Sequence, residues 1–274
     1  MIYHSIKGER IPALGFGTYH LRGPEGIKAI RYALDVGYRH LDTAIRYENE
    51  VEVGRAIAES GIDRSAIFLT TKLRYADLAR DDVRRRTAES LGRLRTDHVD
   101  LLLAHWPNAT IALAETMAAL AEVRAAGQAR HIGISNFPTS LMRQAIEDCG
   151  ADIFTNQVEY HPFLRQNAVL DYVRARGILL TAAVPLARGA VADEPLLQEI
   201  AACQGKSPAQ ITLRWLVQQP HVAAIPKSSR PERIRANFEI FDFALSADET
   251  TAISALGANQ RLVNPKWAPA WDAV

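Results

Sequence analysis

This sequence of 274 residues has little cysteine, no marked excess of positive or negative charge and no long apolar run. The two cysteines, Cys149 and Cys203, are too few for a disulfide framework, so we expect reduced thiols in a cytoplasmic protein. The net charge of +1 gives no electrostatic reason to expect nucleic acid or a membrane surface as a partner. No window approaches a membrane span, and the scattered charges of residues 1–15 leave no apolar core for a signal peptide.

Two further absences concern chemistry. No spacing of histidine, cysteine and carboxylate resembles a zinc site, so we expect no metal. The stretch GFGTYHLRG has the first two glycines of a dinucleotide fingerprint, but His20 stands where the third is required. GISNF lacks the closing glycine of a nucleophile elbow. A dinucleotide, if one binds, must therefore be held without a Rossmann turn.

What the chain does contain is a regular alternation of short apolar runs and segments of helical period. We expect a hairpin over residues 2–11 and then eight strands, at 14–17, 38–42, 67–72, 99–105, 129–135, 153–158, 178–183 and 222–226. Two further helices are expected after Pro231, at 230–238 and 246–256. The pattern predicts one α/β domain over residues 1–274, a (β/α)8 TIM barrel, rather than a doubly wound sheet.

Three successive predicted strands end in titratable side chains, namely Asp42, Lys72 and His105. In such a barrel the active site lies at the carboxyl ends of the strands, where neighbouring side chains can meet. Tyr47 follows on the next loop. We expect Lys72 to lower the pKa of the Tyr47 phenol, ordinarily about 10, and Asp42 to keep the lysine charged. Tyr47 could then serve as a general acid, with His105 donating to the same substrate oxygen.

Each of these residues alone has a structural explanation, as a cap, a solvated strand end or a core histidine. Their coincidence on three consecutive strand ends favours a site for protonating a carbonyl oxygen, with hydride supplied by a cofactor. A cofactor-binding regulatory protein on the same scaffold is the main alternative. A barrel isomerase would need a carboxylate base at the mouth, whereas Asp42 is better explained as the partner of Lys72.

A second cluster, IPKSSRPERIRANF at residues 225–238, brings hydroxyls and cations to the start of a predicted helix. Such a helix start can bind a phosphate, although a capped helix with a solvated basic face fits the pattern equally well. The residues concerned are Lys227, Ser228, Ser229, Arg233 and Asn237.

Together these blocks resemble the aldo-keto reductase superfamily along essentially the whole chain, in its order and spacing. The blocks are GYRHLDTAIRYENEVEVG, FLTTKL, DLLLAHWP, GISNF, NQVEYHP and IPKSSRPERIRANF. The short tail NPKWAPAWD makes the chain most similar to the bacterial diketogluconate and methylglyoxal reductase branch. The resemblance implies a monomeric, NADPH-dependent reductase of aldehydes or activated ketones such as dicarbonyls, keto sugar acids and keto esters.

The resemblance also implies residue roles. Tyr47 would be the acid, tuned by Lys72 and Asp42, and His105 would orient the carbonyl. The residues implied at the nicotinamide are Gly17, Thr18, Ser135, Asn136 and Gln157. Asp42, Pro185 and Leu186 are also implied to bind the cofactor. Those implied around the adenosine and its 2′-phosphate are Lys227, Ser228, Ser229, Arg233 and Asn237. The substrate would meet Tyr19, Tyr47, Arg74, His105 and Trp106.

Three positions depart from the family pattern. Ala183 stands where an aromatic ring would stack on the nicotinamide, and such stacking contributes about 0.5–1.5 kcal/mol beyond burial. Ala236 replaces a carboxylate often found near the adenine. Arg74 stands where a tryptophan commonly lines the pocket. A cation there suggests a preference for carboxylate-bearing or dicarbonyl substrates, and a solvated loop arginine is the alternative.

Overall fold

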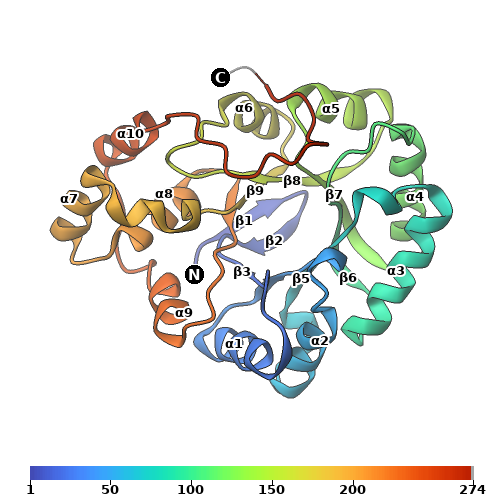
Figure 1. Cartoon of the computed structure of the whole chain (residues 1–274), viewed down its shortest axis with the longest axis horizontal. Helices are drawn as coiled ribbons and strands as arrows, with labels where there is room; N and C mark the ends of the chain where they lie inside the picture. The colour runs from blue at the N-terminus through green and yellow to red at the C-terminus, as the bar shows by residue number, and fades with distance from the viewer. Residues whose placement is uncertain (273–274) are drawn as a thin grey trace.

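The structure, a computed structural model, describes residues 1–272 and contains a ring of eight parallel strands surrounded by helices (Figure 1). The hydrogen-bonded order runs from β10 through β9, β8, β7, β6, β5 and β4 to β3. A parallel bridge between Leu14 and Ala224 joins the two ends of this sheet and closes the barrel. The strands are β3 (Phe16–Gly17), β4 (His40–Asp42), β5 (Phe68–Leu73), β6 (Val99–Ala104), β7 (Ala129–Ser135), β8 (Ile153–Glu159), β9 (Leu179–Ala183) and β10 (Val222–Ala224).

The helices lie outside the ring. They are α1 (Gly23–Val36), α2 (Glu50–Glu59), α3 (Arg80–Leu94), α4 (Leu113–Ala125), α5 (Thr139–Arg143), α6 (Asn167–Ala175), α7 (Pro195–Gln204), α8 (Pro208–Gln218), α9 (Pro231–Phe238) and α10 (Ala247–Ala255). Short helical turns are η1 (Ile45–Tyr47), η2 (Arg64–Ala66), η3 (Tyr75–Asp77), η4 (Gln144–Asp148) and η5 (Ala187–Asp193). The predicted barrel and the two helices expected after Pro231 are confirmed.

Local sequence explains where these elements form. Every residue of β5, β6 and β8 is buried, because the strands of a barrel pack against its interior on one face and against helices on the other. Ser207 and Ser246 form capping boxes that start α8 and α10.

In the described part of the chain, no helix combines the length and the apolar character needed to cross a membrane.

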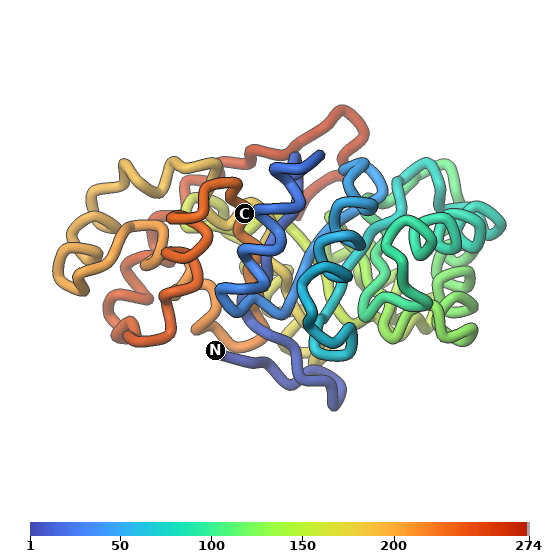
Figure 2. The backbone as a smooth tube through the Cα atoms, turned by 90° about the horizontal axis from the view of Figure 1, so that it is seen from below, coloured from blue at the N-terminus to red at the C-terminus, as the bar shows by residue number. Residues whose placement is uncertain are grey.

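An antiparallel hairpin of β1 (Tyr3–Ile6) and β2 (Glu9–Pro12) closes one end of the barrel. Its side chains Ile6 and Ile11 belong to one apolar cluster with Phe68, Leu101 and Phe154 from the strands. Figure 2 shows the hairpin at one end of the barrel and the C-terminal segment at the other. The hairpin therefore leaves only the opposite end, where the strands finish, open for a site.

Candidate active site

A buried ion pair joins the ends of β4 and β5. Lys72 Nζ lies 2.5 Å from Asp42 Oδ1 and donates a second hydrogen bond to the Thr43 carbonyl at 2.8 Å. The two side chains are 0% and 1% exposed. Two buried charges are tolerated only when hydrogen-bonding partners surround them. The third partner of the Lys72 ammonium is the phenol of Tyr47. Asp42 ends its strand as predicted, whereas Lys72 is one residue inside β5.

Tyr47 is the last residue of η1, the short turn that follows β4. Its hydroxyl lies 3.3 Å from Lys72 Nζ, so Asp42, Lys72 and Tyr47 form one continuous series. The ring of His105, which comes directly after β6, meets the Tyr47 ring edge-on at 5.8 Å between centroids. The four residues singled out from the sequence are therefore together at one end of the barrel.

The electrostatics differ from the sequence-based expectation at Tyr47. Burial raises the pKa of its phenol and outweighs the opposing effect of Lys72, so the net direction is upward rather than downward. Burial also acts against the charge of Lys72, but Asp42 and Tyr47 overcome it and raise the lysine's pKa. Burial, followed by the charges of Lys72 and Arg46, holds the pKa of His105 well below its usual range. A protonated phenol, a charged ammonium and a neutral imidazole result.

Amide side chains extend this network from β7 and β8. Gln157 Nε2 donates to the second carboxylate oxygen of Asp42 at 2.7 Å, and Ser135 Oγ donates to the Gln157 carbonyl at 2.8 Å. Asn136 Nδ2 donates to the His105 carbonyl at 2.9 Å. These three residues, expected from the sequence to hold a carboxamide, lie beside Asp42 and His105.

The turn after β3 faces the same end. Thr18 is buried and donates its hydroxyl hydrogen bond to the Asp42 carbonyl at 2.9 Å. A Cβ at Gly17 would come within 2.9 Å of the Ile225 carbonyl oxygen, so the close approach of β3 to the segment after β10 requires glycine. Across the barrel, Val184 follows β9 with a φ of 52°, a strained backbone for a β-branched residue, and leads into Pro185 and Leu186. Ala183 presents no ring there.

The helix start predicted to bind phosphate is α9. Its N-cap residue, Arg230, makes no side-chain capping bond, so the first-turn N–H groups have no side-chain acceptor there. Lys227 and Arg233 are exposed, and neither has a carboxylate partner within residues 1–272. Burial lowers the pKa of Lys227, a cost that an approaching phosphate would offset. Ser228 and Asn237 are buried beside them, while Ser229 is exposed, so the cluster fits a phosphate group.

The residues expected on the substrate side differ in their surroundings. Tyr19 is 50% exposed, and its ring lies 5.0 Å from that of Tyr47. Trp106 is buried at 5% exposure. Arg74 forms a two-point ion pair with Asp77, at 2.6 and 3.0 Å. Its charge is therefore already matched by a carboxylate.

The C-terminal segment contains contacts that sequence reasoning missed. We call residues 260–272 the strap. The buried carboxylate of Glu159, at the end of β8, accepts the backbone N–H groups of Leu262 at 2.7 Å and Val263 at 2.8 Å. Near its other end, Asp272 accepts the backbone N–H of Thr139 at 3.0 Å. The strap is therefore fixed to the barrel at both ends.

Two tryptophans of the strap pack against residues that follow β5 and β6. Trp267 stacks on Tyr75, with ring centroids 5.3 Å apart and planes 15° apart. Trp271 meets Trp106 edge-on at 6.0 Å. The only signal in the sequence was Glu159, directly after the strand expected at 153–158, because glutamate is an unusual residue to bury without a partner.

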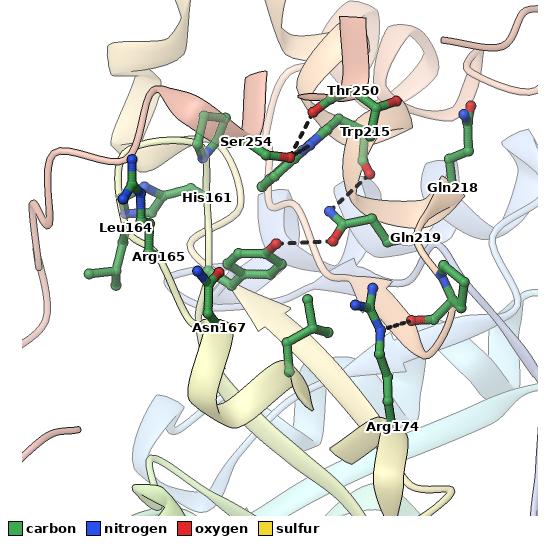
Figure 3. A pocket seen from close by; sticks show the side chains of 14 residues that line it. His161, Leu164, Arg165, Asn167, Arg174, Trp215, Gln218, Gln219, Thr250 and Ser254 are labelled. Atoms are coloured by element: carbon green, nitrogen blue, oxygen red, sulfur yellow. Dashed lines mark hydrogen bonds between the residues drawn. The ribbon is translucent and has the colours of Figure 1, made fainter. Parts of the chain in front are cut away.

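A separate pocket of about 390 Å³ lies on the flank of the barrel between the segment after β8, α8 and α10 (Figure 3). Its polar groups are largely bonded to one another, since the Tyr160 hydroxyl donates to Gln219 and Gln219 donates to the Trp215 carbonyl. The four catalytic candidates are not among its lining residues. The pocket is therefore distinct from the cluster of Asp42, Lys72, Tyr47 and His105.

Nothing in the described residues 1–272 forms a cluster of histidine, cysteine or carboxylate side chains that could hold a metal ion. What the site offers is a phenol proton, a neutral imidazole donor and an ammonium held in place by a carboxylate. These groups suit proton transfer to an oxygen that gains charge during a reaction.

Known proteins share this sequence and architecture. A family model described as "Aldo/keto reductase family" matches residues 13–258. Methylglyoxal reductase DkgB of Salmonella typhimurium is 42% identical over 96% of this chain and 99% of its own length. The 2,5-diketo-D-gluconic acid reductase B of Corynebacterium sp. is 42% identical over 88% of each chain.

Solved structures agree with the sequence relatives. The crystal structure of an aldo/keto reductase from Brucella melitensis superposes with a TM-score of 0.89 at 39% identity, covering 93% of this chain and 99% of the other. With a matching family model over most of its length and relatives of this identity, the chain belongs to the aldo/keto reductase family.

Proposed function

We propose that the protein reduces aldehydes and activated ketones, including dicarbonyls, keto sugar acids and keto esters, with NADPH as the reductant. The observation that carries this proposal is the bonded series of Asp42, Lys72 and Tyr47 beside a neutral His105. The names of the relatives, a methylglyoxal reductase and a diketogluconic acid reductase, support the same substrate class.

In this proposal Tyr47 protonates the carbonyl oxygen, and the cofactor, when bound, would supply the hydride for the carbonyl carbon. The raised pKa of Tyr47 keeps its proton in place at neutral pH until a substrate oxygen that gains negative charge can accept it. Lys72 then stabilises the phenolate that remains, and Asp42 holds Lys72 in position. Neutral His105 donates its N–H to the same oxygen and so orients the carbonyl.

The cofactor would lie across the mouth of the barrel. Gly17 and Thr18 would hold the nicotinamide, with Ser135, Asn136 and Gln157 at its carboxamide, and Pro185 and Leu186 would also bind the cofactor. Lys227, Ser228, Ser229, Arg233 and Asn237 would bind the adenosine half. Lys227 and Arg233, which have no carboxylate partner within residues 1–272, favour NADPH over NADH, because the extra phosphate needs cations. We further propose that residues 1–274 act as one domain and as a cytoplasmic monomer; residues 273 and 274 lie outside the described residues.

The test is NADPH oxidation by the purified protein with methylglyoxal and a panel of aldehydes and keto esters, with NADH in parallel. Tyr47→Phe keeps the ring but removes the acidic proton, so we expect turnover to fall by about a hundredfold to ten-thousandfold. Turnover that survives in this variant would reject Tyr47 as the acid. Wild-type protein that binds NADPH in a fluorescence titration but turns over no carbonyl would favour a cofactor-binding regulatory role, with the missing ring at Ala183 as the first feature to examine.

A further inference from the structure

Two arginines stand near the mouth of the barrel, and only one has a carboxylate partner in the described chain. Arg74, after β5, gives both its Nε and a terminal nitrogen to Asp77. Arg46, which directly precedes Tyr47 on η1, is exposed and forms no ion pair with any residue from 1 to 272. The acid nearest to it in sequence, Glu48, is paired with Arg22 at 2.9 Å. The charge of Arg46 is therefore available to a ligand.

Arg46 lies beside the strap, and its charge acts on His105. Its guanidinium carbon lies 5.7 Å from the centroid of the Trp267 ring, and Trp267 in turn stacks on Tyr75. The strap thus places an aromatic ring beside the guanidinium. The positive charge of Arg46 also helps to lower the pKa of His105, after burial and Lys72, so its field reaches the proposed carbonyl donor.

We propose that Arg46 is a specificity-determining residue that selects carbonyl substrates carrying a carboxylate. The proposal rests on the carbonyl reduction proposed above and narrows its substrate class to aldehydes and ketones with an acid group. A guanidinium presents paired N–H donors that match the two oxygens of a carboxylate, and the adjacent aromatic face makes such a bond stronger than in open water. In this proposal, a substrate whose carboxylate binds Arg46 extends its carbonyl to Tyr47, the next residue on η1.

A matched pair of substrates tests this role in the full chain with NADPH. One is para-formylbenzoate and the other is its methyl ester, which has the same aldehyde and ring without the charge. Arg46→Met removes the charge and keeps an unbranched apolar side chain. The matched control is Arg55→Met, at an exposed residue of α2 that pairs with Glu59, and Arg74→Met tests the other arginine near the mouth. We expect Arg46→Met to lower kcat/KM for the acid by about tenfold to a hundredfold, with the ester within about twofold, because a charged hydrogen-bonded pair is lost.

Two additional measurements test whether the effect comes from the charge of Arg46. Arg46→Lys should recover part of the lost kcat/KM for the acid, because it restores the charge without the planar fork. Raising the ionic strength from about 0.05 to about 0.5 M should weaken wild-type activity on the acid more than the activity of Arg46→Met, since salt screens exposed charges. Thermal unfolding of each variant checks that the fold is intact.

The outcomes separate this inference from the proposed function. If wild type reduces neither aldehyde, the proposed reductase activity fails, and the inference with it. If wild type reduces both and Arg46→Met changes them by the same factor, the role of Arg46 alone is rejected. A selective loss in Arg74→Met with none in Arg46→Met would transfer the role to Arg74 and equally overturn the inference.

Discussion

Lys72 Nζ contacts both the Asp42 carboxylate, at 2.5 Å, and the Tyr47 hydroxyl, at 3.3 Å, from a position with no solvent exposure. One ammonium therefore links a structural ion pair to the proposed acid. Because the lysine has both roles, changes to it should affect stability and activity together, which distinguishes it from Tyr47.

Lys72→Met should lower both the free energy of unfolding and turnover. Removing the ammonium leaves the Asp42 carboxylate buried without its cation, and breaking a buried pair in this way costs about 3–5 kcal/mol. Urea unfolding measures the loss. Lys28→Met is the control, since Lys28 pairs with Glu25 on an exposed helix surface and such pairs contribute about 0–1 kcal/mol. Equal losses in the two variants would contradict the structural role of the buried pair.

The fold was readable from the sequence because barrel strands buried on both faces become apolar runs, and turn residues separate them. Asp42, Lys72 and His105 were found because the topology brings strand ends together whatever the side-chain details. The direction of the Tyr47 pKa shift could not be predicted from the sequence, because it depends on how deeply the phenol is buried. Contacts between segments far apart in the sequence could not be predicted either. Glu159 and Leu262 are 103 positions apart, and nothing in either segment indicates the other.

Acidification should destabilise the protein through His40, which is fully buried beside Thr70 on β4 and β5. Burial lowers the pKa of His40 from 6.5 to about 4. Between those values the unfolded chain binds a proton that the folded chain does not, so stability falls as pH falls through this window. The contribution of one histidine is about 3 kcal/mol over the whole window, at about 1.4 kcal/mol per pKa unit.

The measurement for His40 compares urea unfolding at about pH 7 and about pH 4. His40→Gln should lose less stability on acidification than wild type, since glutamine does not titrate. His20→Asn is the control: His20 is exposed, and asparagine tolerates its positive φ of 64°. If His40→Gln and wild type lose the same amount, His40 is not the titrating group.

Glu159→Gln should loosen the strap without unfolding the barrel. A neutral amide can accept only through one oxygen, so at least one of the bonds from Leu262 and Val263 is lost. Trypsin should then cut faster after Arg261 and Lys266, and amide exchange at Leu262 and Val263 should accelerate. Glu199→Gln, an exposed site on α7, should match wild type in both assays. Unchanged cleavage in Glu159→Gln would mean that the other contacts hold the strap by themselves.

Ala183→Tyr should strengthen binding of NADPH. Ala183 ends β9 on the side where the nicotinamide is proposed to lie, and its small side chain leaves part of the residue accessible. A ring stacked on the cofactor would contribute about 0.5–1.5 kcal/mol, which is about a twofold to tenfold lower Kd in a fluorescence titration. Ala183→Leu adds apolar bulk without an aromatic face, so it separates stacking from burial. Equal gains in the two variants would assign the effect to burial, and a loss in Ala183→Tyr would mean that the strained turn at Val184 has no room for a ring.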